Sequence, residues 1–582
     1  MSVKITEFEN VSIGEPLRKW LPRTADLDAT ETLIEQLNIH PLVARVLTTR
    51  SCSRVDTARE FLSPDRSSLY SPSLMHDLDK AVKRIRKAID TEEKIVVIGD
   101  YDVDGVTSTT LLIRTLRSLK AQVDYIIPSR VEDGYGINVK MVQACFEKSV
   151  GLIITVDNGV AAVEPARVAR QLGIDLIVTD HHHLPDELPK AFAIVHPCYP
   201  RAFYPTATLC GCGVAFKLAQ ALLGRFPEEH LELVAMGTLA DQMSLLGENR
   251  LLVQLGLQQL TLSPSLGVFA LLYVSGLENK RITANHIHFQ VAPRINAVGR
   301  MAHAARVVEL FLTEDPELAM TIANEMSTQN RFRQTIQERV EQEALQQIAD
   351  HPEWLEGNTL VVALEGAHEG VIGIVAGNLT ERFYKPTLCL SIDGDMAKGS
   401  GRSIDGFDLY EALRDVQERS YIFAKYGGHS AAAGFSLHAK DIERLREGFA
   451  YAARRKWTDD ILPPHIYCDA PLRLNEMSFK LSDDLKRLEP YGQANPQPVF
   501  FVKNVVVGRV ETMGTEGKHL KLWVEDDSGR GQEVVAFNRG HEIDHWEEGT
   551  RHHLVVKVEE NIWQTSRKVQ LHLVDHRTAQ NV

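Results

Sequence analysis

Residues 94–105 read Lys94-Ile-Val-Val-Ile-Gly-Asp-Tyr-Asp-Val-Asp-Gly105. The apolar run 95–98 is short and rich in β-branched residues, which predicts a strand covered on both faces. Asp100, Asp102 and Asp104 follow it at alternate positions and share one face wherever the backbone stays extended. Crowded carboxylates repel one another unless cations neutralise them. The stretch therefore predicts a metal site at a strand end or, taken alone, an acidic surface turn.

The same arrangement recurs further along the chain. Three more apolar runs alternate with helical stretches, as in a parallel α/β sheet: 152–156, 174–178 and 192–195. Asp157 follows the first of these runs, and Asp180, His181 and His182 follow the second. Because ligand sites in such folds lie outside the carboxyl ends of the strands, we expect these side chains to meet at one edge of the sheet.

The residue types at this edge indicate which metal would bind. Asp241 ends an apolar helix predicted for 231–240 and would supply a further carboxylate. Oxygen ligands and imidazole without a thiolate pair suit Mg²⁺ or Mn²⁺ better than structural zinc. An array of this size could bind two ions about 4 Å apart, one to activate water and both to clamp a scissile phosphate. The pattern predicts metal-dependent phosphoryl chemistry.

The composition is that of an ordinary globular protein, with 44% hydrophobic and 24% charged residues. Its 582 residues predict about three to four domains. The net charge of −14 argues against a protein that coats nucleic acid by bulk attraction, although a basic groove can lie on an acidic body. Seven scattered cysteines without a CxxC pair favour free thiols in the cytosol. The N-terminus has no apolar h-region, so we expect no signal peptide. No apolar run approaches roughly 18 residues, so we expect no membrane span.

Changes of pattern divide the chain into segments. We expect residues 1–75 to form a helical extension packed on the next domain, and 76–315 to form the α/β domain with the aspartates. The segment 316–352 contains neither Gly nor Pro between its two end residues and is rich in Glu, Gln and Ala, which predicts one long connecting helix. A smaller α/β domain is predicted for 353–460.

The last predicted domain, 465–582, changes character. Five short runs of alternating apolar residues, with turn residues between them, favour a small β-barrel, and an OB-fold is the leading candidate. Its strands carry aromatic residues that could stack on the bases of a single strand, unless they fill the core: Phe500, Phe501, Trp523, Phe537 and Trp563.

Several short motifs resemble those of DHH phosphoesterases. They are Gly99-Asp-Tyr-Asp-Val-Asp-Gly105, Val156-Asp-Asn-Gly159 and Thr179-Asp-His-His182. Others resemble those of the RecJ family of 5′→3′ exonucleases specific for single-stranded DNA: Glu132-Asp-Gly-Tyr-Gly136, Pro293-Arg-Ile-Asn-Ala-Val-Gly-Arg-Met301 and Gly399-Ser-Gly-Arg-Ser403. Gly427-Gly-His429 with Ala431-Ala-Ala-Gly434 resembles the motif of the DHHA1 domain. The resemblance implies a parallel-sheet DHH domain, joined by a long helix to a smaller α/β DHHA1 domain, plus a C-terminal OB-fold barrel.

The resemblance also assigns roles in catalysis. It makes six residues metal ligands: Asp102, Asp104, Asp157, His181, His182 and Asp241. Asp100 and Asp180 would either bind metal or orient a ligand, with Asp180 the better candidate for orienting a histidine. One departure from the family pattern is Cys210-Gly-Cys212, where small residues are expected. A free cysteine packs as a small hydrophobe, so we expect it to be tolerated.

The substrate's phosphates would need cationic partners. By resemblance, Arg130, Ser400 and Arg402 would hold a 5′-terminal phosphate, and His429 would contact the scissile phosphate. Arg294 and Arg300 lie in a neighbouring motif and would bind further phosphates, because the guanidinium group matches phosphate in bidentate geometry. Surface or inter-lobe salt bridges are the alternative role for each arginine.

The leading hypothesis is a hydrolase that uses two divalent cations, Mn²⁺ or Mg²⁺, to degrade single-stranded DNA 5′→3′ to 5′-mononucleotides in repair and recombination. The family implies a cytoplasmic, nucleoid-associated monomer that works with a single-strand-binding protein and a RecQ-type helicase. One alternative is a phosphodiesterase for short oligonucleotides or cyclic dinucleotides, although such chains are generally shorter. The other is a non-catalytic DNA-replication scaffold, but every acidic and histidine position is present here.

Overall fold

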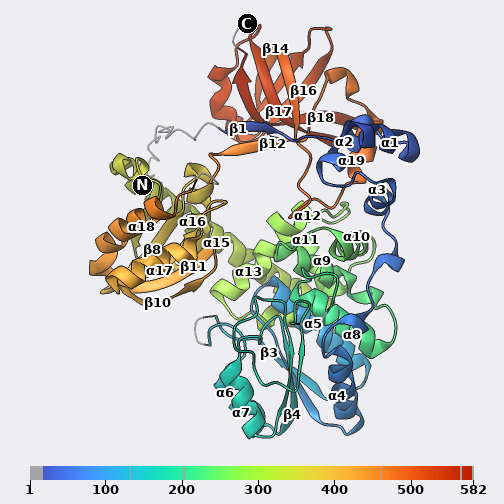
Figure 1. The fold of residues 1–582 in the computed structure, drawn as a ribbon, viewed down its shortest axis with the longest axis vertical. Coiled ribbons are helices and arrows are strands. Elements are labelled where there is room, and N and C mark those ends of the chain that lie inside the picture. Colours follow the sequence, from blue (N-terminus) through green and yellow to red (C-terminus); the bar gives the residue numbers. More distant parts are fainter. Residues whose placement is uncertain (1–17, 131–132, 201–202, 459–460, 564–565, 580–582) are drawn as a thin grey trace. The chain divides into compact units, whose positions relative to one another are not determined.

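The computed structural model describes residues 18–130, 133–200, 203–458, 461–563 and 566–579, with the side chains of 562 and 563 left out. The chain divides into two compact units. The larger unit contains residues 22–329 and 467–582, and the smaller unit contains residues 1–21 and 330–466. Figure 1 shows the helices and strands of each.

A five-stranded parallel sheet organises the first part of the larger unit. Its strand order is β3-β2-β4-β5-β6. The strands are β2 (Lys94–Ile98), β3 (Val123–Ile126), β4 (Val150–Val156), β5 (Asp175–Thr179) and β6 (Ala193–Val195). The predicted strands at 95–98, 152–156, 174–178 and 192–195 are confirmed, and the edge strand β3 was not predicted.

Helices cover both faces of this sheet, as the unbroken apolar strands require. Ile95 and Val97 of β2 point into a core shared with α4 (Leu78–Asp90), α5 (Val103–Ser118) and α8 (Gly211–Leu223). Val96 and Ile98 point to the other face, which is covered by two shorter helices, α6 (Val139–Glu147) and α7 (Val163–Gln171).

Further helices extend the first of these two cores. They are α9 (Leu231–Ala240), α10 (Gly247–Leu262), α11 (Leu266–Val274), α12 (Ala284–His286), the π-helix η4 (Ile287–Val291), α13 (Ala292–Met301) and α14 (Ala305–Leu312). No single helix of the described residues is both long and apolar enough to cross a bilayer; α10 and α11 would qualify only as a pair, and they meet at a 78° bend.

The C-terminal part of the larger unit is a closed five-stranded barrel. Its strands are β14 (Phe500–Met513), β15 (His519–Glu525), β16 (Gly531–Ala536), β17 (Arg551–Trp563) and β18 (Ser566–Thr578). The first strand, β14, pairs with both β15 and β17, and β16 pairs in parallel with β18, which closes the ring. All five strands that the alternating pattern predicted are present.

The packing of the N-terminal helices differs from our prediction. Helices α1 (Leu27–Leu37), α2 (Pro41–Thr49) and α3 (Val55–Leu62) share one core with the barrel and with α19 (Phe479–Lys486). The prediction that this extension packs on the domain next to it in sequence was therefore wrong for these helices. Their apolar faces match a surface formed more than 400 residues later, as the hydrogen bond from the His40 amide to Asp484 (2.7 Å) shows.

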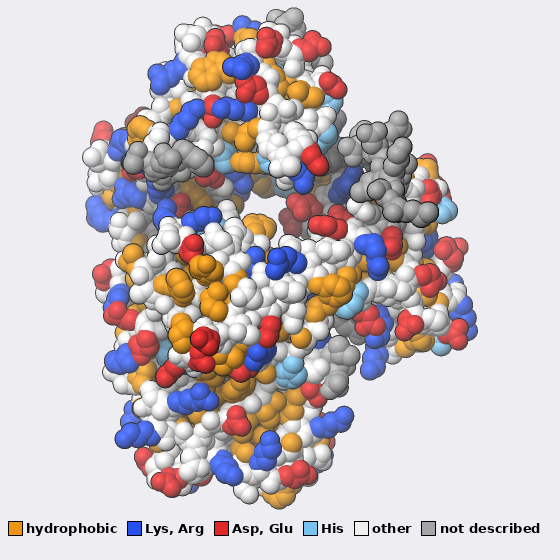
Figure 2. All heavy atoms as spheres, turned by 180° about the vertical axis from the view of Figure 1, so that it is seen from behind, with side chains coloured by type: hydrophobic (Ala, Val, Ile, Leu, Met, Phe, Trp, Pro, Cys, Tyr) orange, Lys and Arg blue, Asp and Glu red, His pale blue; other side chains and the backbone are white. Residues whose placement is uncertain are grey.

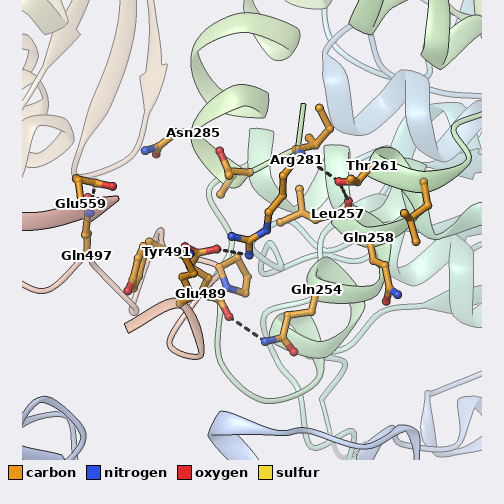
Figure 3. Close-up of a pocket in the computed structure, with 16 residues that line it drawn as sticks. Gln254, Leu257, Gln258, Thr261, Arg281, Asn285, Glu489, Tyr491, Gln497 and Glu559 are labelled. Atoms are coloured by element: carbon orange, nitrogen blue, oxygen red, sulfur yellow. Dashed lines mark hydrogen bonds and ion pairs between the residues drawn. The ribbon is translucent and has the colours of Figure 1, made fainter. Parts of the chain in front are cut away.

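Arg250 of α10 joins the parallel-sheet domain to the segment that leads into the barrel. Its guanidinium is buried and donates to three backbone carbonyls, those of Phe61, Arg487 and Leu488, at 2.9–3.0 Å. A cavity of about 500 Å³ lies beside this junction (Figure 3). Arg281 reaches across it to Glu489 at 2.6 Å, so the cavity is crossed by an ion pair and lies away from the aspartate motifs.

The smaller unit contains a five-stranded mixed sheet of order β10-β11-β9-β8-β7. Its strands are β7 (Leu360–Glu365), β8 (Thr387–Asp393), β9 (Met396–Arg402), β10 (Phe423–Gly428) and β11 (Ala432–His438). Helices α16 (Glu369–Phe383), α17 (Leu409–Ser420) and α18 (Ile442–Lys456) pack on it. The predicted connecting helix is α15 (Pro316–Asp350), which starts in the larger unit and ends in the smaller one.

Charged side chains of both signs are interspersed over the face drawn in Figure 2. The excess of acidic residues, which gives the net charge of −14, therefore does not form a single acidic patch on this face. A surface of this kind leaves recognition of an anionic polymer to local groups of cations rather than to long-range attraction.

Candidate active site

The predicted ligands do meet at the carboxyl edge of the parallel sheet. The loop after β2 carries Asp100 and Asp102, and Asp104 lies in the first turn of α5, which this loop enters. Asp157 follows β4, and Asp180, His181 and His182 follow β5. Asp241 is the C-terminal cap of α9. These elements come from separate parts of the sequence and converge because the parallel strands all end at the same edge.

His181 lies at the centre of the cluster. Its Nε2 atom is 3.1 Å from Asp157 Oδ1, 3.5 Å from Asp241 Oδ2 and 3.7 Å from Asp104 Oδ2. Three sets of side chains each bring their ligand atoms within 4.8 Å of one another: Asp157, His181 and His182; Asp104, His181 and Asp241; and Asp100, Asp102 and Asp157. The first set shares His181 with the second and Asp157 with the third. The arrangement can therefore hold more than one cation in adjacent positions.

The N-terminus of α8 fixes the carboxylate of Asp104. Its two oxygens accept hydrogen bonds from the amides of Gly211 (2.5 Å) and Cys212 (2.9 Å). The amides at a helix N-terminus favour negative charge. A Cβ at Gly237 of α9 would lie 2.5 Å from Asp104 Oδ1, so that glycine makes room for the carboxylate. The cysteines at 210 and 212 are buried, as expected for small apolar side chains.

The backbone at Asp157 is unusual. Its φ of +61° is in the left-handed region, which a residue with a Cβ rarely adopts. Such strain persists where the surrounding structure fixes it, often at functional sites. Here the Asp157 amide donates to the Thr179 carbonyl (3.0 Å), and a Cβ at Gly211 would meet the Asp157 side chain at 2.5 Å. In this conformation Oδ1 of Asp157 lies 3.1 Å from Nε2 of His181.

Asp180 orients the histidine loop. Its Oδ1 accepts from the amides of His181 (2.7 Å) and His182 (3.1 Å) and lies 2.7 Å from Nδ1 of His182, while Oδ2 accepts from the amide of Val160 (2.9 Å). With both oxygens engaged, Asp180 occupies the orienting role more readily than a ligand role. His183 is exposed.

Burial and mutual repulsion raise the pKa of several carboxyl groups in the cluster. Burial, with the charge of Asp102, raises the pKa of Asp100 to about 8, and burial with Asp104 raises the pKa of Asp241 to about 8. The pKa of Asp157 is also raised, mainly by burial. Burial lowers the pKa of His181. For His182, burial opposes the charged form, but the hydrogen bond that its Nδ1 donates to Asp180 prevails and raises its pKa to about 9.

These groups fit a divalent cation. Asp100 Oδ1 and Asp241 Oδ2 are buried without a hydrogen-bond partner among the described residues. Orphaned carboxylate oxygens are costly to bury, and a cation would satisfy them and remove the repulsion that raises their pKa values. Carboxylates with neutral imidazole match Mn²⁺ and Mg²⁺.

Residues without an assigned role support this centre. The hydroxyl of Tyr135 donates to the Asp157 carbonyl (3.0 Å) and lies 3.1 Å from Nδ1 of His182. Asn158 donates to the carbonyls of Ile98 (3.1 Å) and Val156 (2.9 Å), tying the ends of β2 and β4 together. Tyr135 and Asn158 both belong to motifs quoted above, and this was the sequence signal that could have marked them as functional. Glu132 of the same motif lies outside the described residues.

Of the predicted arginines in the larger unit, Arg130 lies beside the cluster, and Arg294 and Arg300 belong to α13. The guanidinium of Arg130 is 5.5 Å from the ring centre of Tyr101, between Asp100 and Asp102 in sequence. Helix α13 approaches the same loop closely, since a Cβ at Gly299 would lie 2.7 Å from the Tyr101 carbonyl. Arg294 donates to the Gln290 carbonyl at 2.5 Å. Arg300 is in the last turn of α13 and is partly exposed.

Ser400, Arg402 and His429 belong to the smaller unit. Ser400 and Arg402 are two residues apart on β9 and therefore share a face, with Arg402 Nη1 3.2 Å from Ser400 Oγ. Gly373 of α16 opposes them, since a Cβ there would lie 2.9 Å from Ser400 Oγ and 3.1 Å from Arg402 Nη2. His429 is exposed in the turn between β10 and β11.

The predicted aromatic residues of the barrel divide into two groups. Phe500 is fully buried and belongs to the core, whereas Trp523 of β15 and Phe537, directly after β16, are 42% and 49% exposed. Phe501 is partly buried. The side chain of Trp563 lies outside those that the structure describes. Only some of the five could therefore meet a ligand.

Three protein-family profiles match the chain. They are the DHH family N-terminal domain at residues 94–238, the DHHA1 domain at 356–454 and the RecJ OB domain at 468–575. Together they span the parallel sheet, the mixed sheet and the barrel described above.

Curated relatives and solved structures agree with these profiles. The single-stranded-DNA-specific exonuclease RecJ of Bacillus subtilis is 39% identical over 96% of this chain and 70% of the relative. The protein of the same name from Escherichia coli is 33% identical over 90% of this chain and 92% of the relative. The crystal structure of RecJ in complex with Mn²⁺ from Thermus thermophilus matches with a TM-score of 0.82 and 29% identity, over 97% of this chain and 80% of that one.

Proposed function

The chain belongs to the RecJ family of DHH phosphoesterases, and on that premise we propose that it is an exonuclease that degrades single-stranded DNA 5′→3′ to 5′-mononucleotides. The observation that carries the proposal is the convergence of Asp104, Asp157 and Asp241 on Nε2 of His181 within 3.7 Å. Such a centre serves phosphodiester hydrolysis, the chemistry used in DNA repair and recombination.

The enzyme uses divalent cations, Mn²⁺ or Mg²⁺. Six side chains would hold two of them: Asp102, Asp104, Asp157, His181, His182 and Asp241. When bound, such ions supply a Lewis acid that neutralises phosphoryl charge and makes water a better nucleophile. Asp100 would either bind metal as a further ligand or orient the neighbouring ligand Asp102.

The protein's own residues set the geometry of the reaction. Asp180 holds the His182 ring at 2.7 Å, and the amides of α8 hold Asp104, so both ligands are fixed before substrate arrives. Pre-positioned groups of this kind lower the barrier without reorganising during the reaction. Arg294 and Arg300, both on α13, would bind further phosphates of the strand.

A separate group in the smaller unit would recognise the 5′ end. Ser400 and Arg402 present a hydroxyl and a guanidinium on one face of β9, beside a glycine of α16 that leaves space next to them. This combination suits a terminal phosphate. His429 would contact the scissile phosphate, and Arg130 would share the 5′-terminal one.

The barrel would hold the DNA downstream of the cleavage site. Trp523 and Phe537 are exposed, and stacking on a base contributes about 1–3 kcal/mol at such positions. Replacing both by alanine should weaken binding of a long single strand measured by fluorescence anisotropy, while a strand too short to reach the barrel should bind as before. A double variant that bound the long strand as tightly as the parent does would exclude a role for this face.

We further propose that the enzyme acts as a monomer in the cytoplasm, at the nucleoid, with a single-strand-binding protein and a RecQ-type helicase. A helicase would supply the single strand that the enzyme needs. Co-purification of the chain with each candidate, with and without nuclease treatment, would distinguish direct protein contact from binding of both proteins to the same DNA.

Digestion of end-labelled DNA tests the main proposal. A 5′-labelled single strand should lose its label as a mononucleotide with Mn²⁺ or Mg²⁺, while a 3′-labelled strand shortens progressively and a blunt duplex stays intact. Both reactions should stop in EDTA and in the Asp157→Asn variant. Release of label first from the 3′ end, or cleavage limited to dinucleotides, would overturn the proposal in favour of another polarity or a small-substrate phosphodiesterase.

A further inference from the structure

The connection between β16 and β17 of the barrel contains the sequence Gly540-His-Glu-Ile-Asp-His545. The pattern H-E-x-x-H binds zinc when it lies on an α-helix, because residues four apart then share one face. Here the segment is the 3₁₀ helix η9 (Gly540–His545), with three residues per turn. Residues three apart are aligned instead, so Glu542 and His545 share a face and His541 does not join them.

A third potential ligand comes from the last strand of the barrel. His576 of β18 brings a ring nitrogen to this face, and one ligand atom each from Glu542, His545 and His576 lie within 4.8 Å of one another. Nε2 of His576 is 3.4 Å from Oε2 of Glu542. Two ligands at about 2.0–2.1 Å from a tetrahedral zinc ion are separated by about 3.3–3.4 Å, so this pair needs little movement to share an ion.

Packing holds the His576 ring in place. Trp546, which is buried, covers it at a centroid distance of 4.2 Å. Nδ1 of His576 is buried and has no hydrogen-bond partner among the described residues. The ring is thus fixed with its other nitrogen facing Glu542.

Arg539 and His541 also lie near the carboxylate of Glu542. Arg539 Nη1 is 3.3 Å from Glu542 Oε2, and its Nη2 donates to the Val574 carbonyl at 2.8 Å. His541 Nε2 is 3.9 Å from Oε1 of Glu542. The guanidinium neutralises Glu542 when no cation is bound, and its bond to Val574 would keep it nearby after a metal displaced it from the carboxylate.

We propose that Glu542, His545 and His576 form a second metal site, for Zn²⁺ or a similar transition-metal ion, with water in the remaining position. Two imidazoles and one carboxylate favour zinc, whereas the carboxylate-rich centre of the parallel sheet favours Mn²⁺ or Mg²⁺. A bound ion links η9 to β18 and so fastens the β16–β17 connection across the barrel. The proposal is independent of the nuclease reaction.

Zinc stoichiometry provides the first test. The tag-free full chain, saturated with Mn²⁺, is dialysed against buffered Zn²⁺ and its zinc content is measured. The His545→Ala variant should bind one zinc fewer per chain than the parent, and His541→Ala should bind the same number. Both histidines are exposed on one short helix, so neither substitution opens a core. Equal zinc content in the parent and His545→Ala would overturn the proposal, as would an equal loss in the two variants.

Quenching of tryptophan fluorescence by Cu²⁺ supplies a local readout, because Trp546 lies against His576. Saturable quenching is expected in the parent and in His541→Ala. The saturable quenching should be lost in His545→Ala. In Trp546→Phe it should fall to whatever quenching the other tryptophans show. If Trp546→Phe and His545→Ala both kept the full saturable quenching, the ion would be bound elsewhere and the proposed site would be excluded.

Discussion

Nδ1 of His182 lies 2.7 Å from Oδ1 of Asp180, and the same oxygen accepts the His182 backbone amide at 3.1 Å. One carboxylate therefore fixes both the backbone and the ring of the histidine. The contact leaves Nε2 of His182 as the nitrogen that can face a cation, which is how carboxylates commonly set the tautomer of a ligating histidine.

Replacement of Asp180 by Asn should weaken metal binding more than it slows catalysis. The amide cannot stabilise the His182 ring as the carboxylate does, and loss of such an orienting partner typically lowers metal affinity about 10–100-fold. We expect the Mn²⁺ concentration for half-maximal nuclease activity to rise by that factor, with most activity recovered at high Mn²⁺. Asp175→Asn is the matched control, since Asp175 lies at the other end of β5 and pairs with Arg84 (2.6 Å). An unchanged Mn²⁺ requirement in Asp180→Asn would contradict the orienting role.

Gly237→Ala should damage the active site without unfolding the protein. The added methyl group would lie 2.5 Å from Asp104 Oδ1 and 2.9 Å from Thr107 Oγ1. Displacing a ligand by a fraction of an ångström to an ångström can cost about 10²-fold in rate, and overpacking costs about 1–3 kcal/mol of stability.

Gly256→Ala separates these two effects. Its methyl group would lie 2.2 Å from the Leu231 carbonyl, so it disturbs the packing of α10 on α9 without touching a ligand. Specific activity of the folded fraction and the thermal unfolding midpoint are measured for both variants. Gly256→Ala should lower mainly the midpoint and Gly237→Ala mainly the activity; the reverse pattern would argue against a role for Gly237 at the site.

The Ser400–Arg402 pair can be tested through the helix that opposes it. Gly373→Ala would place a methyl group 2.9 Å from Ser400 Oγ, whereas Gly377→Ala, one turn further along α16, meets only Arg402 Cγ at 3.9 Å. If the pair binds a 5′-phosphate, Gly373→Ala should raise KM about 10–100-fold for 5′-phosphorylated strands, the range of a lost charge-assisted hydrogen bond. Strands with a 5′-hydroxyl should show no such change, and Gly377→Ala should resemble the parent on both. The same KM increase on both kinds of strand would refute end recognition here.

The parallel sheet was predictable because its signals are local. Short β-branched runs specify buried strands, and parallel strands bring their carboxyl ends together, so Asp157 and His181 could be placed side by side from sequence. The support for Asp104 from the amides of α8 was not predictable. It depends on where a helix more than 100 residues away begins, and no periodicity in the sequence encodes that position.

The position of α1–α3 was missed for a related reason. Their apolar faces show that they are buried, but an amphipathic pattern does not name the partner that buries it. The barrel strands, in contrast, were visible from their alternation, while closure between β14 and β17 came only from the structure. The orienting role of Asp180 lies between these cases: the sequence marked the residue as a candidate for either role, and its contacts with Val160 and His182 favour orienting.

Stability of the metal-free enzyme should fall as pH rises from about 6.5 to about 8.5. Asp100 and Asp241 have pKa values raised to about 8 in the folded state. A group whose pKa is raised on folding binds its proton more tightly in the native protein, so its stabilising contribution is full at low pH and is lost as pH rises through the folded pKa. The measurement starts at about pH 6.5 because burial lowers the pKa of His230 from 6.5 to about 4, so this group adds an opposite trend at lower pH.

A divalent cation should cancel this loss, because it replaces the protons on the same carboxylates. Calorimetric unfolding midpoints of the domain with the parallel sheet are compared in EDTA and in saturating Mn²⁺ across the window. We expect the difference between the two midpoints to widen as pH rises, and to widen less in Asp241→Asn, which lacks one of the titrating groups. Midpoints that run parallel with and without Mn²⁺ would mean that these carboxylates are not the groups that exchange protons for metal.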